Sequence, residues 1–314
     1  MDDDSLWLLR LVATGAVNLG LTVLAGCFAS LWMLVADESA WARRRARSMA
    51  RVVGGSVLWS MAATVFLLWT EAAVMSEQPM LNAAGSVGTV LMRTHVGHAW
   101  IIGAAALLTL ALSPLLPWRE PVDRRRLGLA IACAAAFAAS KSWASHAGAS
   151  GDLLPFIVDW VHLLCVSVWA GVVFVAAAAV LREPMPVDLL ERTECARFVE
   201  TLSTTATWSL AGVVVTGAFS SWRGLGGSIG PLISSTYGEI LLVKLALVAS
   251  AVALGAHNRF AVMPRLLTSI RAPSQSFDAL LRTFGRVLDV ETFVLLAVLL
   301  AAAALGTTAP PATP

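Results

Sequence analysis

The chain has 314 residues, of which 58% are hydrophobic and 13% are charged, and its net charge is +2. No water-exposed surface could accommodate this composition, so a soluble protein is excluded and an integral membrane protein is predicted. The apolar runs are unbroken rather than alternating, which favours membrane-spanning helices over a barrel of strands.

Eight apolar segments are long enough to cross a bilayer, and we predict an all-α bundle of eight transmembrane helices. In chain order the expected spans are Leu6–Val35, Val52–Met75, Leu91–Leu116, Leu127–Ser145, Pro155–Leu181, Phe198–Phe219, Tyr237–Ala256 and Val287–Gly306. The first span follows three aspartates, without a basic leader or a small-residue cleavage site, so we expect it to be retained rather than removed as a signal peptide. Residues 1–314 are expected to form a single transmembrane domain with no soluble domain beside it.

The basic residues predict how the bundle sits in the membrane, because Lys and Arg accumulate in short cytoplasmic loops. Arginines cluster after the first, third, fifth and seventh spans, whereas the alternate loops hold few. Both termini are therefore expected on the outer face, which in a bacterium is the periplasmic side of the inner membrane. Topology accounts for the arginine clusters, so no nucleic-acid partner is expected.

Four of the five histidines lie where the predicted spans reach the outer face. His95 and His98 open the third span, His146 closes the fourth, and His162 lies in the first turns of the fifth. A single histidine at a helix end is usually an interfacial polar residue. Four histidines from three helices at one depth favour a shared metal site.

Helical spacing adds further candidate ligands, because residues three apart share one face of a helix. The two rows are Met92, His95 and His98 in the third span, and Asp159, His162 and Cys165 in the fifth. Imidazole, thioether and thiolate together suit copper, and a carboxylate can complete a Cu(II) environment. Zinc would accept the histidines equally well and stays open, although zinc gives no reason for a methionine.

Short motifs in this order resemble the copper resistance D (CopD) family of bacterial inner-membrane proteins. They are Ser145-His146-Ala147, Asp159-Trp160-Val161-His162-Leu163-Leu164, Trp169-Ala170-Gly171, Thr236-Tyr237-Gly238, Lys244-Leu245, Asn258-Arg259 and Pro264-Arg265. The resemblance covers about residues 91–306 and supports His146 and His162 most directly. Ser145 and Val172 stand where the family has glycine, and neither change removes a candidate ligand.

The resemblance implies copper handling at the cytoplasmic membrane, with copper moving from the periplasm to the cytoplasm. It also implies a small periplasmic copper-binding partner of the CopC type, which we expect as a separate chain. Two alternatives stay open: a haem-binding membrane redox protein, since facing histidines in a bundle can ligate haem, and a copper-sensing accessory subunit without transport. The sequence holds no Walker loop, Gly-x-Ser-x-Gly or zincin motif, so no enzymatic activity is expected.

Overall fold

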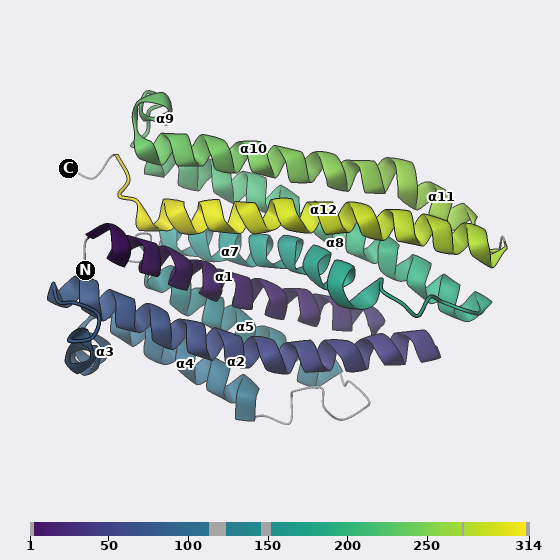
Figure 1. The fold of residues 1–314 in the computed structure, drawn as a ribbon, viewed down its shortest axis with the longest axis horizontal. Coiled ribbons are helices and arrows are strands. Elements are labelled where there is room, and N and C mark those ends of the chain that lie inside the picture. The colour runs from purple at the N-terminus through teal and green to yellow at the C-terminus, as the bar shows by residue number, and fades with distance from the viewer. Residues whose placement is uncertain (1–2, 113–123, 146–151, 272, 312–314) are drawn as a thin grey trace.

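The structure is a computed structural model that describes residues 3–112, 124–145, 152–271 and 273–311. Within these residues every regular element is a helix, which confirms the predicted all-α class. The long helices run side by side along one bundle (Figure 1). They are α1 (Asp3–Leu34), α2 (Ala40–Ser76), α4 (His95–Leu112), α5 (Arg124–Trp143), α7 (Leu153–Val175), α8 (Leu189–Gly224), α10 (Thr236–His257) and α12 (Ser274–Thr307).

Shorter helical elements extend or connect the long ones. They are η1 (Ala83–Ser86), α3 (Val87–Arg93), the π-helical turn η2 (Ala176–Val180), α9 (Pro231–Ser234), the π-helical turn η3 (Asn258–Val262) and α11 (Met263–Thr268). The two π-helical turns continue α7 and α10 without a break in the chain's helical course. Such continuity satisfies the backbone hydrogen bonds within each segment, as lipid requires.

Seven helical segments of the described chain are long and apolar enough to cross a membrane. The long helix that falls short of this criterion is α5, because it begins with three arginines and has Lys141 near its end. It nevertheless packs against α1, α4 and α7 inside the bundle. The chain is thus a multi-pass membrane protein, and the predicted count of eight spans stays a prediction.

Three of the predicted spans begin too late. The structure starts α2 at Ala40 instead of Val52, α8 at Leu189 instead of Phe198, and α12 at Ser274 instead of Val287. Hydropathy assigned the polar residues before these spans to loops, whereas they form helical turns beyond the apolar stretch. Side-chain caps fix two of the starts: Ser39 Oγ accepts from the Ala42 N–H at 3.1 Å, and Asp188 Oδ1 accepts from the Glu191 N–H at 2.8 Å.

Because α2 starts early, its first arginines contact the start of α8 and the chain segment that precedes α8. Arg44 pairs with Glu191 at 3.2 Å, and Arg45 donates to the backbone carbonyl oxygen of Pro184 at 2.8 Å. The carboxylate of Glu194 accepts from the backbone N–H groups of Glu38 and Ser39. These contacts tie three chain segments together at one end of the bundle.

Helix α1 lies at the centre of the packing and contacts α2, α7, α12 and α5. Its closest approach is to α7, where Gly26 faces Gly171 and a Cβ added to either glycine would collide with the other's backbone. Small residues allow this backbone contact, which is a common way for membrane helices to associate. The α1–α7 contact fixes the position of the helix that carries Asp159, His162 and Cys165.

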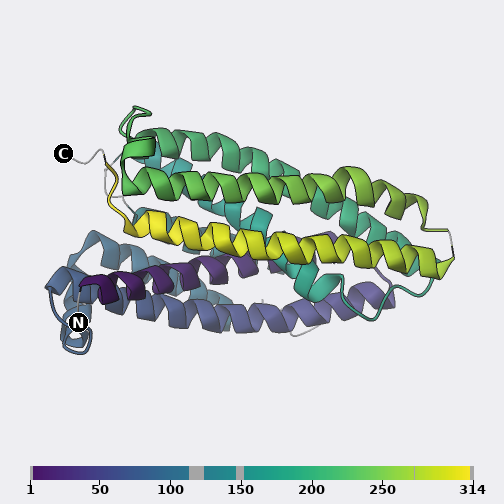
Figure 2. The same cartoon turned by 45° about the horizontal axis from the view of Figure 1, so that its top comes forward.

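The two chain ends lie at the same end of the bundle, together with α3 and α9, in both views (Figures 1 and 2). The arginine-rich first turns of α2 and α8 lie at the opposite end (Figure 1). This arrangement agrees with an even number of crossings. Which end faces the periplasm stays a prediction.

Candidate metal site

His162 lies on α7 and faces α8. Its Nδ1 is 2.9 Å from Thr216 Oγ1, and a Cβ added to Gly217 would lie 3.2 Å from its Cε1. The Thr216 hydroxyl donates its only proton to the carbonyl oxygen of Gly212, at 2.6 Å. With that proton on Gly212 the oxygen of Thr216 accepts toward His162, and on this basis we assign Nδ1 of the imidazole as the donor.

This hydrogen-bond order fixes the chemistry of the imidazole ring. With the proton on Nδ1, the Nε2 atom carries a free lone pair and can bind a metal ion. Histidine ligands are usually oriented by a carboxylate, a backbone carbonyl or a water that accepts the other ring N–H, and the Thr216 hydroxyl takes that place here. Sequence spacing singled out His162 but not Thr216, which is the residue that holds the ring.

Cys165 lies one turn further along α7 and faces the same stretch of α8. A Cβ added to Gly212 would be 2.5 Å from the Cys165 Sγ, so the thiol occupies space that only a glycine leaves. The thiol is free of any disulfide. His162 and Cys165 thus lie along one α7–α8 interface, as the spacing of three predicts.

Asp159, the third member of the predicted row, is bound by Ser142 of α5 and by Ser145 just after α5, and not by α8. Its Oδ2 accepts hydrogen bonds from Ser142 Oγ at 2.7 Å and from Ser145 Oγ at 3.2 Å. Its charge also acts on Lys141 and on Lys244 of α10, and the charge of Lys244 acts on His162. Lys244 is thus the side chain that interacts electrostatically with both Asp159 and the His162 imidazole.

The predicted row of Met92, His95 and His98 on one helix is wrong. The chain breaks at Thr94, which is extended (φ −115°, ψ 151°), so Met92 belongs to α3 while the two histidines begin α4. The break is a cap, because Thr94 Oγ1 accepts from the Gly97 N–H at 2.9 Å. The thioether side chain of Met92 does not share a helix face with the histidines.

The two α4 histidines have partners of their own. His95 packs edge-on against Trp143 of α5, with ring centroids 5.2 Å apart, and His98 Nε2 lies 3.2 Å from the backbone carbonyl oxygen of Met92. Trp143 directly follows Ser142, which binds Asp159. The α4 and α7 parts of the predicted site are thus connected through the end of α5.

His146 lies outside the described residues. Within the part of the chain that the structure describes, no three His, Cys, Asp or Glu side chains are grouped so that they could hold a metal ion. The set predicted from sequence, with His146 at its centre, therefore stays a prediction. The described residues contribute His162 with an oriented ring, Cys165 beside it, and Asp159 beside two lysines.

Comparison with known proteins gives consistent matches. Residues 1–155 match the family model "Copper resistance protein D-like, N-terminal domain", and residues 196–305 match the family model "Copper resistance protein D". Copper resistance protein D of Pseudomonas syringae pv. tomato is 27% identical over 247 residues, which cover 76% of this chain and 76% of that protein. No solved structure matches. The similarity extends to residue 1 and is wider than the expected range of 91–306.

Proposed function

Because the chain belongs to the copper resistance D family, we propose that it moves copper ions from the periplasm to the cytoplasm across a bacterial inner membrane. The observation that carries the proposal is the orientation of His162. Its Nδ1 is hydrogen-bonded to Thr216, and in the tautomer assigned above Nε2 is available as a ligand inside a membrane bundle. In a bilayer an ionisable or metal-binding group of this kind indicates a functional site.

The proposed route begins at the end of the bundle that holds the termini. His146, His95, His98 and Asp159 capture copper there, assisted by Met92, and His162 receives it. Cys165 lies one turn further inward and offers sulfur, which selects Cu(I). A succession of sites that each bind weakly lets an ion leave as well as enter.

Lys244 near His162 fits weak binding. A copper ion bound at Nε2 would lie within the field of Lys244, whose charge Asp159 offsets in part. The repulsion lowers the affinity of the site for a cation, because charges interact strongly at low dielectric. A transit site needs this property, whereas a storage site does not.

The proposal includes eight crossings with α5 among them, both termini in the periplasm, and a separate periplasmic copper-binding partner of the CopC type. It assigns no catalysed covalent reaction to the chain. Entry of a cation would be driven by the membrane potential, which is worth about 2.3 kcal/mol per charge for each 100 mV.

Copper flux into proteoliposomes tests this function. The full chain is reconstituted, a membrane potential negative inside is imposed, and Cu(I) uptake is followed with an internal chelator. We expect copper uptake by the parent. We also expect it in the control variant His257→Ala, which removes an exposed histidine at the C-terminal end of α10. His162→Ala should lose uptake. Copper binding with zero flux in the parent would instead indicate an accessory subunit, and a Soret band in the purified protein would indicate haem.

A further inference from the structure

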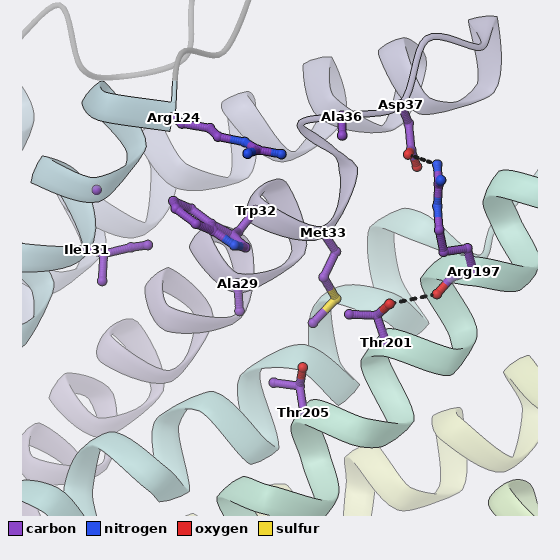
Figure 3. A pocket seen from close by; sticks show the side chains of 11 residues that line it. Ala29, Trp32, Met33, Ala36, Asp37, Arg124, Ile131, Arg197, Thr201 and Thr205 are labelled. Atoms are coloured by element: carbon purple, nitrogen blue, oxygen red, sulfur yellow. Dashed lines mark hydrogen bonds and ion pairs between the residues drawn. The ribbon is translucent and has the colours of Figure 1, made fainter.

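A groove lies at the arginine-rich end of the bundle, far from the candidate metal site. Its volume is about 700 Å³, and it is formed by the end of α1, the start of α5 and the first half of α8 (Figure 3). This volume is within the range of small-molecule pockets in proteins. The groove is not part of the proposed copper route, since none of the predicted ligands lines it.

The walls of the groove are mainly apolar. Trp32 and Met33 of α1 and Ile131 of α5 line it, and 49% of the Trp32 surface and 38% of the Ile131 surface are exposed. Exposed apolar side chains on the flank of a membrane-spanning bundle face lipid. Tryptophan is enriched at the membrane–water boundary, where its ring lies at the level of the headgroups.

Two arginines reach the groove from opposite sides. Arg124 extends over Trp32 from the start of α5, and Arg197 of α8 pairs with Asp37 (Figure 3). For Arg124 the structure records no acidic partner among the residues it describes. Arg197 is 56% exposed at its side chain and has five N–H donors, so one ion pair leaves donors available. The groove thus presents excess positive charge above an apolar floor.

We propose that this groove binds an anionic phospholipid, with the lipid phosphate between Arg124 and Arg197 and an acyl chain against Trp32, Met33 and Ile131. A basic pocket between membrane helices on one face of the bilayer is a typical binding site for an anionic headgroup. The apolar floor distinguishes this occupant from a free anion, because a water-soluble anion gains nothing from Met33 or Ile131. The proposal is independent of copper transport.

Gly128 of α5 provides a way to block the groove without changing its charge. It lines the groove, and a Cβ added there would meet no atom within 4 Å. A leucine side chain at this position would therefore start in open space and extend into the place of the acyl chain. Gly55 of α2 is equally open, is exposed and does not line the groove, so it provides a matched control.

Native mass spectrometry of the detergent-solubilised full chain tests the proposal. Phosphatidylglycerol and phosphatidylcholine are titrated separately, and the dissociation constant of the first bound lipid is measured. We expect phosphatidylglycerol to bind more tightly, and Arg124→Gln to weaken it about fivefold, since one arginine near anionic lipid is worth about 1 kcal/mol. Gly128→Leu should weaken it at least as much, whereas Arg126→Gln and Gly55→Leu should leave it unchanged.

Three results would overturn the proposal. Equal losses in Arg124→Gln and Arg126→Gln would show that the effect is general surface charge. Unchanged binding in Gly128→Leu would show that no acyl chain occupies the groove. Displacement of phosphatidylglycerol by equimolar inorganic phosphate would make the groove a free-anion site. If Arg124→Gln does not fold, the Gly128→Leu and Gly55→Leu pair still decides the outcome.

Discussion

The hydroxyl of Thr216 should set the copper affinity of His162, and Thr216→Val tests this most directly. Valine has nearly the same shape as threonine, so the α7–α8 packing is retained while the acceptor of the imidazole N–H is removed. The carbonyl oxygen of Gly212 loses only an additional donor, because it still accepts the helical N–H of Thr216. The group left without its partner is therefore the Nδ1–H of His162.

The expected effect follows from that one unpaired donor. Leaving a buried N–H unsatisfied costs about 1–3 kcal/mol, and loss of the group that orients a histidine ligand typically weakens metal binding about 10- to 100-fold. We expect copper affinity to fall within that range in Thr216→Val and to recover in Thr216→Ser. The matched control is Thr193→Val, because Thr193 makes the same bond to a carbonyl four residues earlier on α8 and faces no histidine.

Copper affinity is measured by competition with a chromophoric Cu(I) chelator in detergent. Nitrogen NMR of histidine-labelled protein gives a second readout, since it distinguishes the two neutral tautomers of His162. The reasoning is refuted if Thr216→Val binds copper like the parent, or if the ring of the parent carries its proton on Nε2. A loss shared with Thr193→Val would mean that the α8 helix, and not the ring orientation, has been disturbed.

Three further predictions concern the topology, the inner end of the route and a buried carboxyl group. Alkaline phosphatase fused after Pro314 should be active and green fluorescent protein at the same place should be dark; the reverse pattern would place the candidate site on the cytoplasmic side. Cys165→Ser should reduce copper accumulation in expressing cells while copper binding by the purified protein is largely retained, and unchanged accumulation would make Cys165 a packing residue. Burial raises the pKa of Asp37 from 3.8 to about 6 despite the attraction of Arg197. Ionisation of this carboxyl group therefore lowers the stability of the folded state. The stability of the parent relative to Asp37→Asn should be greatest below pH 4 and decline up to about pH 6. The full pKa shift would correspond to about 1 kcal/mol between pH 7 and pH 5, and solvent screening makes the measured stability difference smaller than this. A difference in thermal melts that does not change with pH would contradict the assigned pKa.

The class of the fold could be predicted from composition, because a bilayer admits few solutions for a chain with such long apolar runs. The helix ends could not be predicted from hydropathy. Arg44 and Arg45 look like loop residues in sequence, yet their partners on other segments allow helix α2 to continue beyond the apolar stretch. Their partners are well over 100 residues away, and hydropathy in a local window contains no information about them.

The break ahead of α4 has a local signal in the sequence. Thr94 followed three residues later by Gly97 is a plausible helix start, because a threonine side chain can accept the N–H of the third residue. The close approach of α3 also requires a glycine there, since a Cβ on Gly97 would collide with Val90 and Leu91. The capping pattern at Thr94 therefore indicates a new helix start, which assigns Met92 and the two histidines to different helices. Helical spacing alone places all three residues on one helix face.

The α8 half of the candidate site has a weaker signal. Gly212, Thr216 and Gly217 form a small-residue pattern of the kind found where membrane helices touch, but the pattern does not name the partner helix. Periodicity indicates which residues share a face, whereas the neighbour that covers that face is decided by the whole bundle. His162 and Cys165 could therefore be paired from spacing, and Thr216 could not be assigned to them.

The helix interfaces also determine how the histidines can act. Helix α5 contacts both α4 and α7, with Trp143 against His95 on one side and Ser142 bound to Asp159 on the other. The α4 histidines and His162 thus lie at different helix interfaces, and His146 lies outside the described residues. Between His95 and Asp159 of α7 lie Trp143 and Ser142 of α5. The described histidines therefore do not form one shared site, which is the arrangement that successive capture and transfer in the proposed function requires.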